Sequence, residues 1–174
     1  MNHHDMTRNM VLAALFAALT AIGAFLQIPT GTVPITLQFL FTALAGLLLG
    51  WKWGAISQLL YVGIGLLGLP VFTQGGGIGY VLQPSFGFLL GLIPAAAVIG
   101  AMTARRTGYL TVLAAVLVGD LILYAVGVPY MYLILHVYMQ SAKTFPALLA
   151  AMLVYVPGDT LKIVVVTALA PVLR

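Results

Sequence analysis

The chain has 174 residues, of which 63% are hydrophobic and 6% are charged, and its formal net charge is +4 at pH 7. A soluble domain carries about 25% charged residues, so this composition excludes a protein whose whole surface faces water. The absence of cysteine excludes thiol chemistry, and no basic cluster larger than Arg105-Arg106 is present to bind nucleic acid.

The apolar runs are long and do not alternate with polar residues, which predicts an all-α integral membrane protein rather than a barrel. We interpret the first run as a retained helix rather than a cleaved signal peptide, because it is about 19 residues long. Pro29 and Gly31 end it, and a Trp-Lys-Trp turn at 51–53 separates the second and third runs. A single membrane domain over residues 1–174 is expected, with six transmembrane helices at about 8–28, 33–50, 54–69, 86–104, 109–135 and 146–173.

The basic residues predict the orientation of these helices. With the N-terminus inside, the inner side holds five basic residues, and the outer loops hold only Lys143. Because inner loops are enriched in Lys and Arg, both termini are expected to be cytoplasmic. The five inner residues are Arg8, Lys52, Arg105, Arg106 and Arg174.

Two opposite charges lie in the last apolar run. Asp159 and Lys162 are three residues apart, so on a helix they share one face. They can be a self-neutralising structural pair, but intramembrane ionisable residues are by default candidates for function. Because Asp offers only acceptors and Lys only donors, the pair matches a ligand edge with an N–H beside a C=O, such as a urea, amide or lactam.

The fifth run contains a further acid, Asp120, near its middle, and several tyrosines. Asp120 can be structural or functional, and its sequence context leaves both open. Tyr124 follows one helical turn later and is expected to face a ligand, whereas Tyr130 and Tyr132 can belong to an interfacial aromatic belt.

The loop QGGGIGY, at 74–80, has the glycine content of a phosphate loop but not its Gly-Lys-Ser/Thr ending. It can be a plain flexible connection, or a lid whose bare backbone approaches a ligand. In the second case Gly76 and Gly77 contact the ligand, and Tyr80 and Gln83 supply an aromatic wall and a hydrogen bond.

Thr36 and Gln38 follow Pro34 at the start of the second run. Thr36 can be an ordinary first-turn residue. Gln38 carries an amide into the apolar zone, where it needs a partner, and we expect both side chains to face the pocket.

The first run carries two lines of small residues at helical spacing, and such lines let helices approach closely. They can serve packing inside the chain or docking to another membrane protein. The first line contains Ala13, Ala17 and Ala21, and the second contains Ala14 and Ala18.

Three segments in order, VPITLQ at 33–38, LLGLPVFTQGGGIGY at 66–80 and PGDTLK at 157–162, resemble the BioY family of biotin-specific S-components of energy-coupling factor (ECF) transporters. The resemblance covers nearly the whole chain. It implies a six-helix, non-enzymatic subunit in the plasma membrane of a prokaryote, which captures biotin from outside. It also implies a coupling transmembrane subunit and two cytoplasmic ATPase subunits that use ATP, with no cofactor or metal bound by this chain.

For the site, the resemblance implies that Asp159 and Lys162 hold the ureido ring and that the loop at 70–84 closes over the ligand. It implies that the alanine lines dock onto the coupling subunit. The biotin carboxylate has no basic partner in the outer loops except Lys143, so backbone N–H groups of the glycine loop or solvent are expected to serve it. The loop departs from the family pattern at Thr73, Gln74, Gln83 and Phe86, where relatives often carry small residues.

Two other classes of function are weighed against this one. An intramembrane enzyme would use Asp120 and Asp159 as a carboxylate pair, but the sequence has no nucleophile constellation or metal-ligand spacing. The charged residues in the middle of the apolar runs also agree with a proton-coupled secondary transporter that works alone. No inverted repeat, which many such transporters have, is visible in the sequence.

Overall fold

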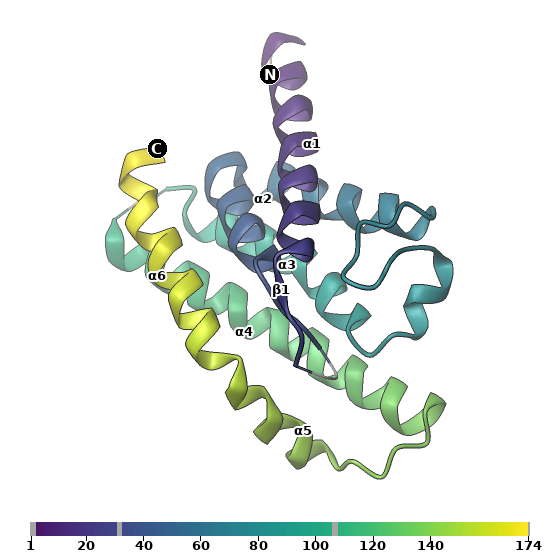
Figure 1. Cartoon of the computed structure of the whole chain (residues 1–174). Coiled ribbons are helices and arrows are strands. Elements are labelled where there is room, and N and C mark those ends of the chain that lie inside the picture. Colours follow the sequence, from purple (N-terminus) through teal and green to yellow (C-terminus); the bar gives the residue numbers. More distant parts are fainter. Residues whose placement is uncertain (1–2, 31–32, 106–107, 174) are drawn as a thin grey trace.

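The protein is described by a computed structural model that covers residues 3–30, 33–105 and 108–173, so Gly31, Arg106 and Arg174 lie outside the described residues. In this part of the chain there are six α-helices and a small hairpin (Figure 1), and the buried apolar residues form a large cluster and a smaller one near the start of α5 (Phe145–Ala151). The predicted α-helical membrane fold is confirmed. The α-helices are α1 (His3–Phe25), α2 (Gln38–Leu66), α3 (Phe86–Met102), α4 (Tyr109–Leu133), α5 (Phe145–Ala151) and α6 (Val156–Leu173).

The chain between α1 and α2 forms an antiparallel hairpin instead of helix ends. Its strands are β1 (Gln27–Ile28) and β2 (Ile35–Thr36), and Gln27 pairs with Thr36. The predicted boundaries at 8–28 and 33–50 are therefore wrong at these ends, because the backbone groups of both segments bond to each other. The first helix also begins earlier than predicted, at His3.

The predicted second and third spans are the two halves of α2, which fold back on each other at Gly50. The Gln38 Nε2 of the first half lies 2.8 Å from the Tyr61 hydroxyl of the second, and the Thr42 Oγ1 lies 2.9 Å from the Gln58 Oε1. Gly50 has φ 76°, a conformation that glycine adopts without strain. The chain therefore reverses direction at Gly50, directly before the Trp-Lys-Trp segment predicted as the turn, and these three residues already belong to the second half of α2. Glycines also bring α2 and α3 together, since a Cβ on Gly46 would lie 2.5 Å from the Ala96 carbonyl oxygen.

The last two predicted spans also differ from the structure. Helix α4 continues through Pro129 to Leu133, and a π-helical turn, η2 (Ile134–Tyr138), follows it. The predicted span at 146–173 is divided into α5, a 3₁₀ turn, η3 (Met152–Val154), and α6. A single helix over 146–173 would need a backbone N–H at position 157, and Pro157 has none.

Four helices of the described chain are long and apolar enough to cross a membrane: His4–Phe25, Gln38–Leu66, Tyr109–Tyr138 and Val156–Leu173. The second of these reverses at Gly50, so it consists of two antiparallel helical halves. Two apolar helices are shorter, Phe86–Met102 and Phe145–Val154. Both ends of the chain point toward the top of Figure 1, whereas the hairpin and α5 lie at the bottom. The start of α6 lies against the second strand of the hairpin, where Lys162 donates a hydrogen bond to the Thr36 carbonyl oxygen. The pocket described next lies at this contact.

Candidate functional site

Asp159 and Lys162 form a buried ion pair in the first two turns of α6. The Lys162 Nζ lies 2.6 Å from the Asp159 Oδ1, and both residues are more than nine-tenths buried. Tyr124 of α4 donates its hydroxyl to the other carboxylate oxygen of Asp159, and Lys162 donates to the Thr36 carbonyl oxygen at 3.2 Å. The predicted common face is confirmed, and the pair also joins α6 to α4 and to the hairpin.

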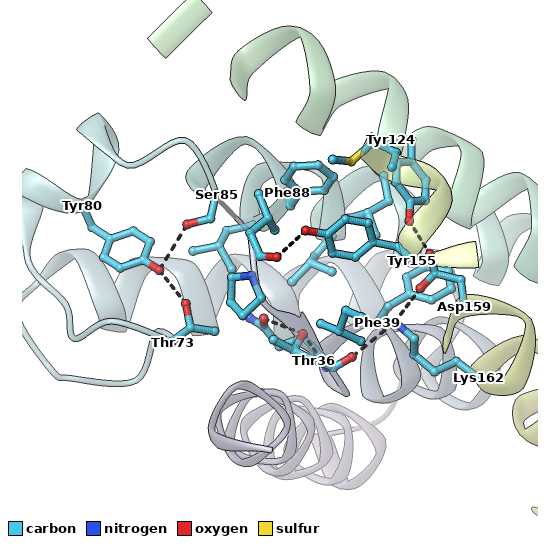
Figure 2. A pocket seen from close by; sticks show the side chains of 18 residues that line it. Thr36, Phe39, Thr73, Tyr80, Ser85, Phe88, Tyr124, Tyr155, Asp159 and Lys162 are labelled. Atoms are coloured by element: carbon cyan, nitrogen blue, oxygen red, sulfur yellow. Dashed lines mark hydrogen bonds and ion pairs between the residues drawn. The ribbon is translucent and has the colours of Figure 1, made fainter. Parts of the chain in front are cut away.

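This pair opens onto a pocket between the hairpin, the glycine-rich loop and helices α2, α3, α4 and α6 (Figure 2). The ion pair and Tyr124 lie at one end of it, and Thr73, Tyr80 and Ser85 lie at the other. The wall between the two ends is mostly apolar. The lining residues are Val33, Pro34, Ile35, Thr36, Gln38, Phe39, Thr73, Tyr80, Ser85, Phe88, Leu89, Leu92, Leu123, Tyr124, Met152, Tyr155, Asp159 and Lys162.

Gln38 lines the pocket, and its amide has the partners that its burial requires. Its Oε1 accepts a hydrogen bond from the Thr36 hydroxyl at 2.9 Å, and its Nε2 donates to the Tyr61 hydroxyl at 2.8 Å. Tyr61 in turn donates to the Val71 carbonyl oxygen at 3.0 Å. One chain of hydrogen bonds therefore connects the pocket wall to the start of the glycine-rich loop.

The structure separates the predicted residues of this loop. Tyr80, in the 3₁₀ turn η1 (Ile78–Leu82), lines the pocket, but Gly76 and Gly77 do not. Both glycines shape the backbone of the loop: Gly77 has φ 99° and donates its N–H to the Gly65 carbonyl oxygen at 2.7 Å. Gly76 lies so close to the chain before the loop that a Cβ would be 2.0 Å from the Leu69 carbonyl oxygen.

We therefore expect Gly76→Ala to destabilise the folded loop, because backbone atoms must move to admit the new methyl group. Overpacking of this kind typically costs about 1–3 kcal/mol. Gly79→Ala is the matched control, since a Cβ there meets nothing within 4 Å. Thermal unfolding of the detergent-solubilised protein measures both. Equal melting temperatures for the two variants would contradict the close approach at Gly76.

Sequence reasoning missed Tyr155, which lies in the pocket wall one helical turn before Asp159. Its hydroxyl bonds to the Val33 carbonyl oxygen and lies 2.8 Å from the Thr30 Oγ1, so it ties the hairpin to the start of α6. The spacing of four residues from Asp159 was a usable signal, because it places both side chains on one helix face. Ser85 was missed as well.

Asp120 lies outside the pocket lining, and its Oδ1 is buried without a hydrogen-bond partner in the described chain. Within residues 3–30, 33–105 and 108–173, no three His, Cys, Asp or Glu side chains come together in a group that could hold a metal ion. The polar chemistry of the pocket therefore belongs to residues other than Asp120.

The two alanine lines of α1 face different environments. Ala13 and Ala17 are buried inside the chain, whereas Ala14 and Ala18 are exposed. The prediction of a docking role is wrong for Ala13, which is fully buried and packs within this chain. Ala14 and Ala18 line an apolar groove between α1 and the second half of α2, which we call the alanine groove. It is lined by Ala14, Ala17, Ala18, Ala21, Ile22, Leu60, Tyr61, Ile64 and Val71.

The sequence pattern of the BioY family matches residues 1–174. The chain belongs to the BioY family. A "Probable biotin transporter BioY" from Lysinibacillus sphaericus is 55% identical over 141 residues, which are 80% of this chain and 72% of the relative. The "Biotin transporter BioY" of Thermotoga maritima is 35% identical and covers 94% of both chains.

A solved structure agrees with this assignment. The crystal structure of the S-component for biotin from an ECF-type ABC transporter is 29% identical, with a TM-score of 0.87. The match covers 100% of this chain and 94% of the other. BioY is a family of transporters, so the alternative of an intramembrane enzyme with Asp120 and Asp159 as its carboxylate pair is wrong.

Proposed function

We propose that this chain captures biotin and mediates its uptake as the membrane-embedded S-component of an ECF-type transporter. The observation that carries the proposal is the buried Asp159–Lys162 pair at one end of an otherwise largely apolar pocket. A buried charge pair is costly unless it is well hydrogen-bonded, and here it lies where a ligand can reach it.

The pair complements a ureido group. Biotin's ureido ring carries two N–H donors beside a carbonyl acceptor. The Asp159 carboxylate accepts from an N–H, and the Lys162 ammonium donates to the carbonyl. Tyr124 holds the carboxylate through its second oxygen, and Thr36 and Gln38 complete the polar end of the pocket. Phe39, Phe88 and the leucines of the lining suit the bicyclic body and the alkyl chain.

The partners and the orientation in the membrane belong to the same proposal. The alanine groove docks a coupling transmembrane subunit, and two cytoplasmic ATPase subunits supply the energy. Both termini face the cytoplasm of a prokaryotic cell, as the five-to-one distribution of basic residues favours. The pocket opens to the outside, so the glycine-rich loop and the hairpin are the elements that control entry of the ligand.

Calorimetric titration of the purified protein in detergent tests the proposal. We expect saturable, one-to-one binding of biotin. Thiamine should not bind, because it has no N–H beside a C=O, and riboflavin should not bind, because its N–H and C=O edge belongs to a planar tricyclic ring rather than to a small bicycle. Equal affinity for all three vitamins, or no heat of binding with biotin at concentrations up to the millimolar range, would rule out biotin capture. Uptake of biotin that needs the partner subunits and ATP would separate this function from a stand-alone, proton-coupled transporter.

A further inference from the structure

Four polar side chains form a hydrogen-bonded group inside the helix packing. Thr20 of α1, Thr42 of the first half of α2, and Ser57 and Gln58 of its second half are all 0% exposed. The Gln58 Oε1 lies 2.9 Å from the Thr42 Oγ1, and the Gln58 Nε2 lies 3.2 Å from the Thr20 Oγ1 and 3.1 Å from the Ser57 Oγ. One amide therefore joins three helical segments, and we call these four residues the buried polar network.

The buried polar network lies between the ligand pocket and the alanine groove. Toward the pocket, the Thr42 Oγ1 lies 3.0 Å from the carbonyl oxygen of Gln38, whose side chain lines the pocket. Toward the groove, Thr20 directly precedes Ala21, which belongs to the groove lining. Gln58 itself lines neither of the two. Its influence on either surface must therefore pass through its hydrogen-bonded neighbours.

The hydroxyls around Gln58 do not need its amide as a partner. Polar side chains often hold membrane helices together, but the hydroxyls of Thr20, Thr42 and Ser57 each have a backbone carbonyl acceptor in their own helix, at 2.8, 3.0 and 2.7 Å. They would stay hydrogen-bonded if position 58 were apolar. A buried amide carries a desolvation cost that a leucine at this position would not have. Satisfying its neighbours is therefore not a sufficient reason for an amide at position 58.

The hydroxyl of Thr42 has two alternative arrangements. It carries one proton, whereas two acceptors lie within reach, the Gln38 carbonyl oxygen at 3.0 Å and the Gln58 Oε1 at 2.9 Å. Donation to Gln38 strengthens the first turn of α2, which begins at the pocket. Donation to Gln58 ties that turn to the second half of α2. One proton shared between two acceptors at similar distances is a two-state element, and a small movement on either side shifts its balance.

We propose that the buried polar network couples occupancy of the ligand pocket to docking at the alanine groove, with Gln58 as the positioning residue that connects them. The inference rests on the proposed function, because it needs both a ligand and a docked partner. A ligand that moves the start of α2 changes which acceptor Thr42 uses, and a partner helix against α1 moves Thr20 relative to the Gln58 amide. Because coupling between two binding events is reciprocal, each changes the affinity of the other by the same factor.

The coupling is measured as a ratio of two affinities. Biotin is titrated, without ATP, into the protein alone in nanodiscs and into the protein assembled with the coupling subunit and the two ATPase subunits. We expect the two dissociation constants of the parent to differ by about fivefold or more, as is typical of coupled sites. In Gln58→Leu they should differ by about twofold or less, a remainder that the direct contact of Tyr61 with both surfaces can carry. Biotin affinity of the Gln58→Leu protein alone should stay within about threefold of the parent, since Gln58 does not line the pocket.

Thr42→Val removes the shared proton and keeps the branched shape, so it should reduce the ratio in the same way, and it preserves the test if Gln58→Leu does not fold. Ser57→Ala is the matched control: it removes an equally buried hydroxyl that bonds to Gln58 within the same half of α2, and it should keep the ratio of the parent.

A parent ratio within about twofold of one would overturn the coupling. An unchanged ratio in both Gln58→Leu and Thr42→Val would assign the network to helix packing, and so would an equal loss of the ratio in Ser57→Ala. Failure of the parent protein alone to bind biotin would instead refute biotin capture itself.

Discussion

Asp159→Asn is expected to weaken biotin binding by about 30-fold to several thousandfold. The substitution keeps the size of the side chain but replaces an acceptor by a donor at the ureido edge. It also leaves the Lys162 ammonium, 2.6 Å away and buried, without its countercharge. Loss of one partner from a buried, hydrogen-bonded charge pair costs about 2–5 kcal/mol, and each 1.4 kcal/mol changes the affinity tenfold.

Lys162→Met should weaken binding to a comparable extent. Methionine fills a similar volume, but it donates nothing to the ligand carbonyl or to the Thr36 carbonyl oxygen, which Lys162 contacts at 3.2 Å. Asp159 would retain the hydroxyl of Tyr124 as its remaining side-chain partner. The loss should therefore appear mainly as an increased dissociation rate, since a buried contact is broken rather than a long-range attraction.

Thr160→Val is the matched control for both variants, because Thr160 lies on the same turn of α6, is exposed, and bonds only to the Val156 carbonyl oxygen of its own helix. Calorimetry gives the affinity of each variant, and thermal unfolding shows whether the fold survives. If Asp159→Asn and Lys162→Met both bind biotin within threefold of the parent, the ion pair is structural and the ureido ring is bound elsewhere.

The sequence predicted the membrane helices better than their ends. A helix in lipid needs a long apolar run, and such runs are visible along the chain. The reversal between the second and third spans was predicted at residues 51–53, and it lies at Gly50. A single residue of positive φ in place of a loop was not visible, because it depends on the close approach of the two halves of α2, where a Cβ on Gly54 would lie 2.8 Å from the Gly46 Cα. The hairpin was missed because its strands, Gln27–Ile28 and Ile35–Thr36, are too short to show an alternating pattern.

The residues of the candidate site also fall into those that the sequence could identify and those that it could not. Asp159 and Lys162 were identifiable because two charges three residues apart are rare in an apolar run, and one helix fixes their relation. Ser85 and Thr73 were not, because they come from a helix start and a loop that meet Tyr80 only after the chain folds. The two alanine lines were identifiable by their spacing, but the spacing carries no information about which line other helices of the chain would cover.

Ala14→Trp and Ala18→Trp are expected to abolish ATP-driven uptake while leaving biotin binding nearly intact. Both alanines are exposed and line the alanine groove, and an indole on either would fill it and hold a partner helix away. Neither residue lines the ligand pocket. Uptake by cells that also express the coupling and ATPase subunits, co-purification with the coupling subunit, and calorimetry with biotin together measure the effect.

Leu15→Trp is the control, because Leu15 lies on the same helix, is also exposed, and is not part of the groove lining. It adds bulk at the same depth of α1 and should leave uptake and co-purification unchanged. Ala13→Trp is a different kind of variant: Ala13 is fully buried, so the added ring should destabilise the protein itself.

The two functions are separable only if the groove and the pocket are energetically independent at Ala14 and Ala18. Tyr61 contacts both, since it lines the groove and its hydroxyl accepts a hydrogen bond from Gln38 in the pocket wall. It is therefore unsuitable for this test, whereas the two alanines have no such link to the pocket. If Ala14→Trp and Ala18→Trp lose biotin affinity as severely as they lose uptake, the groove is part of the internal packing, and the coupling subunit must dock on another face.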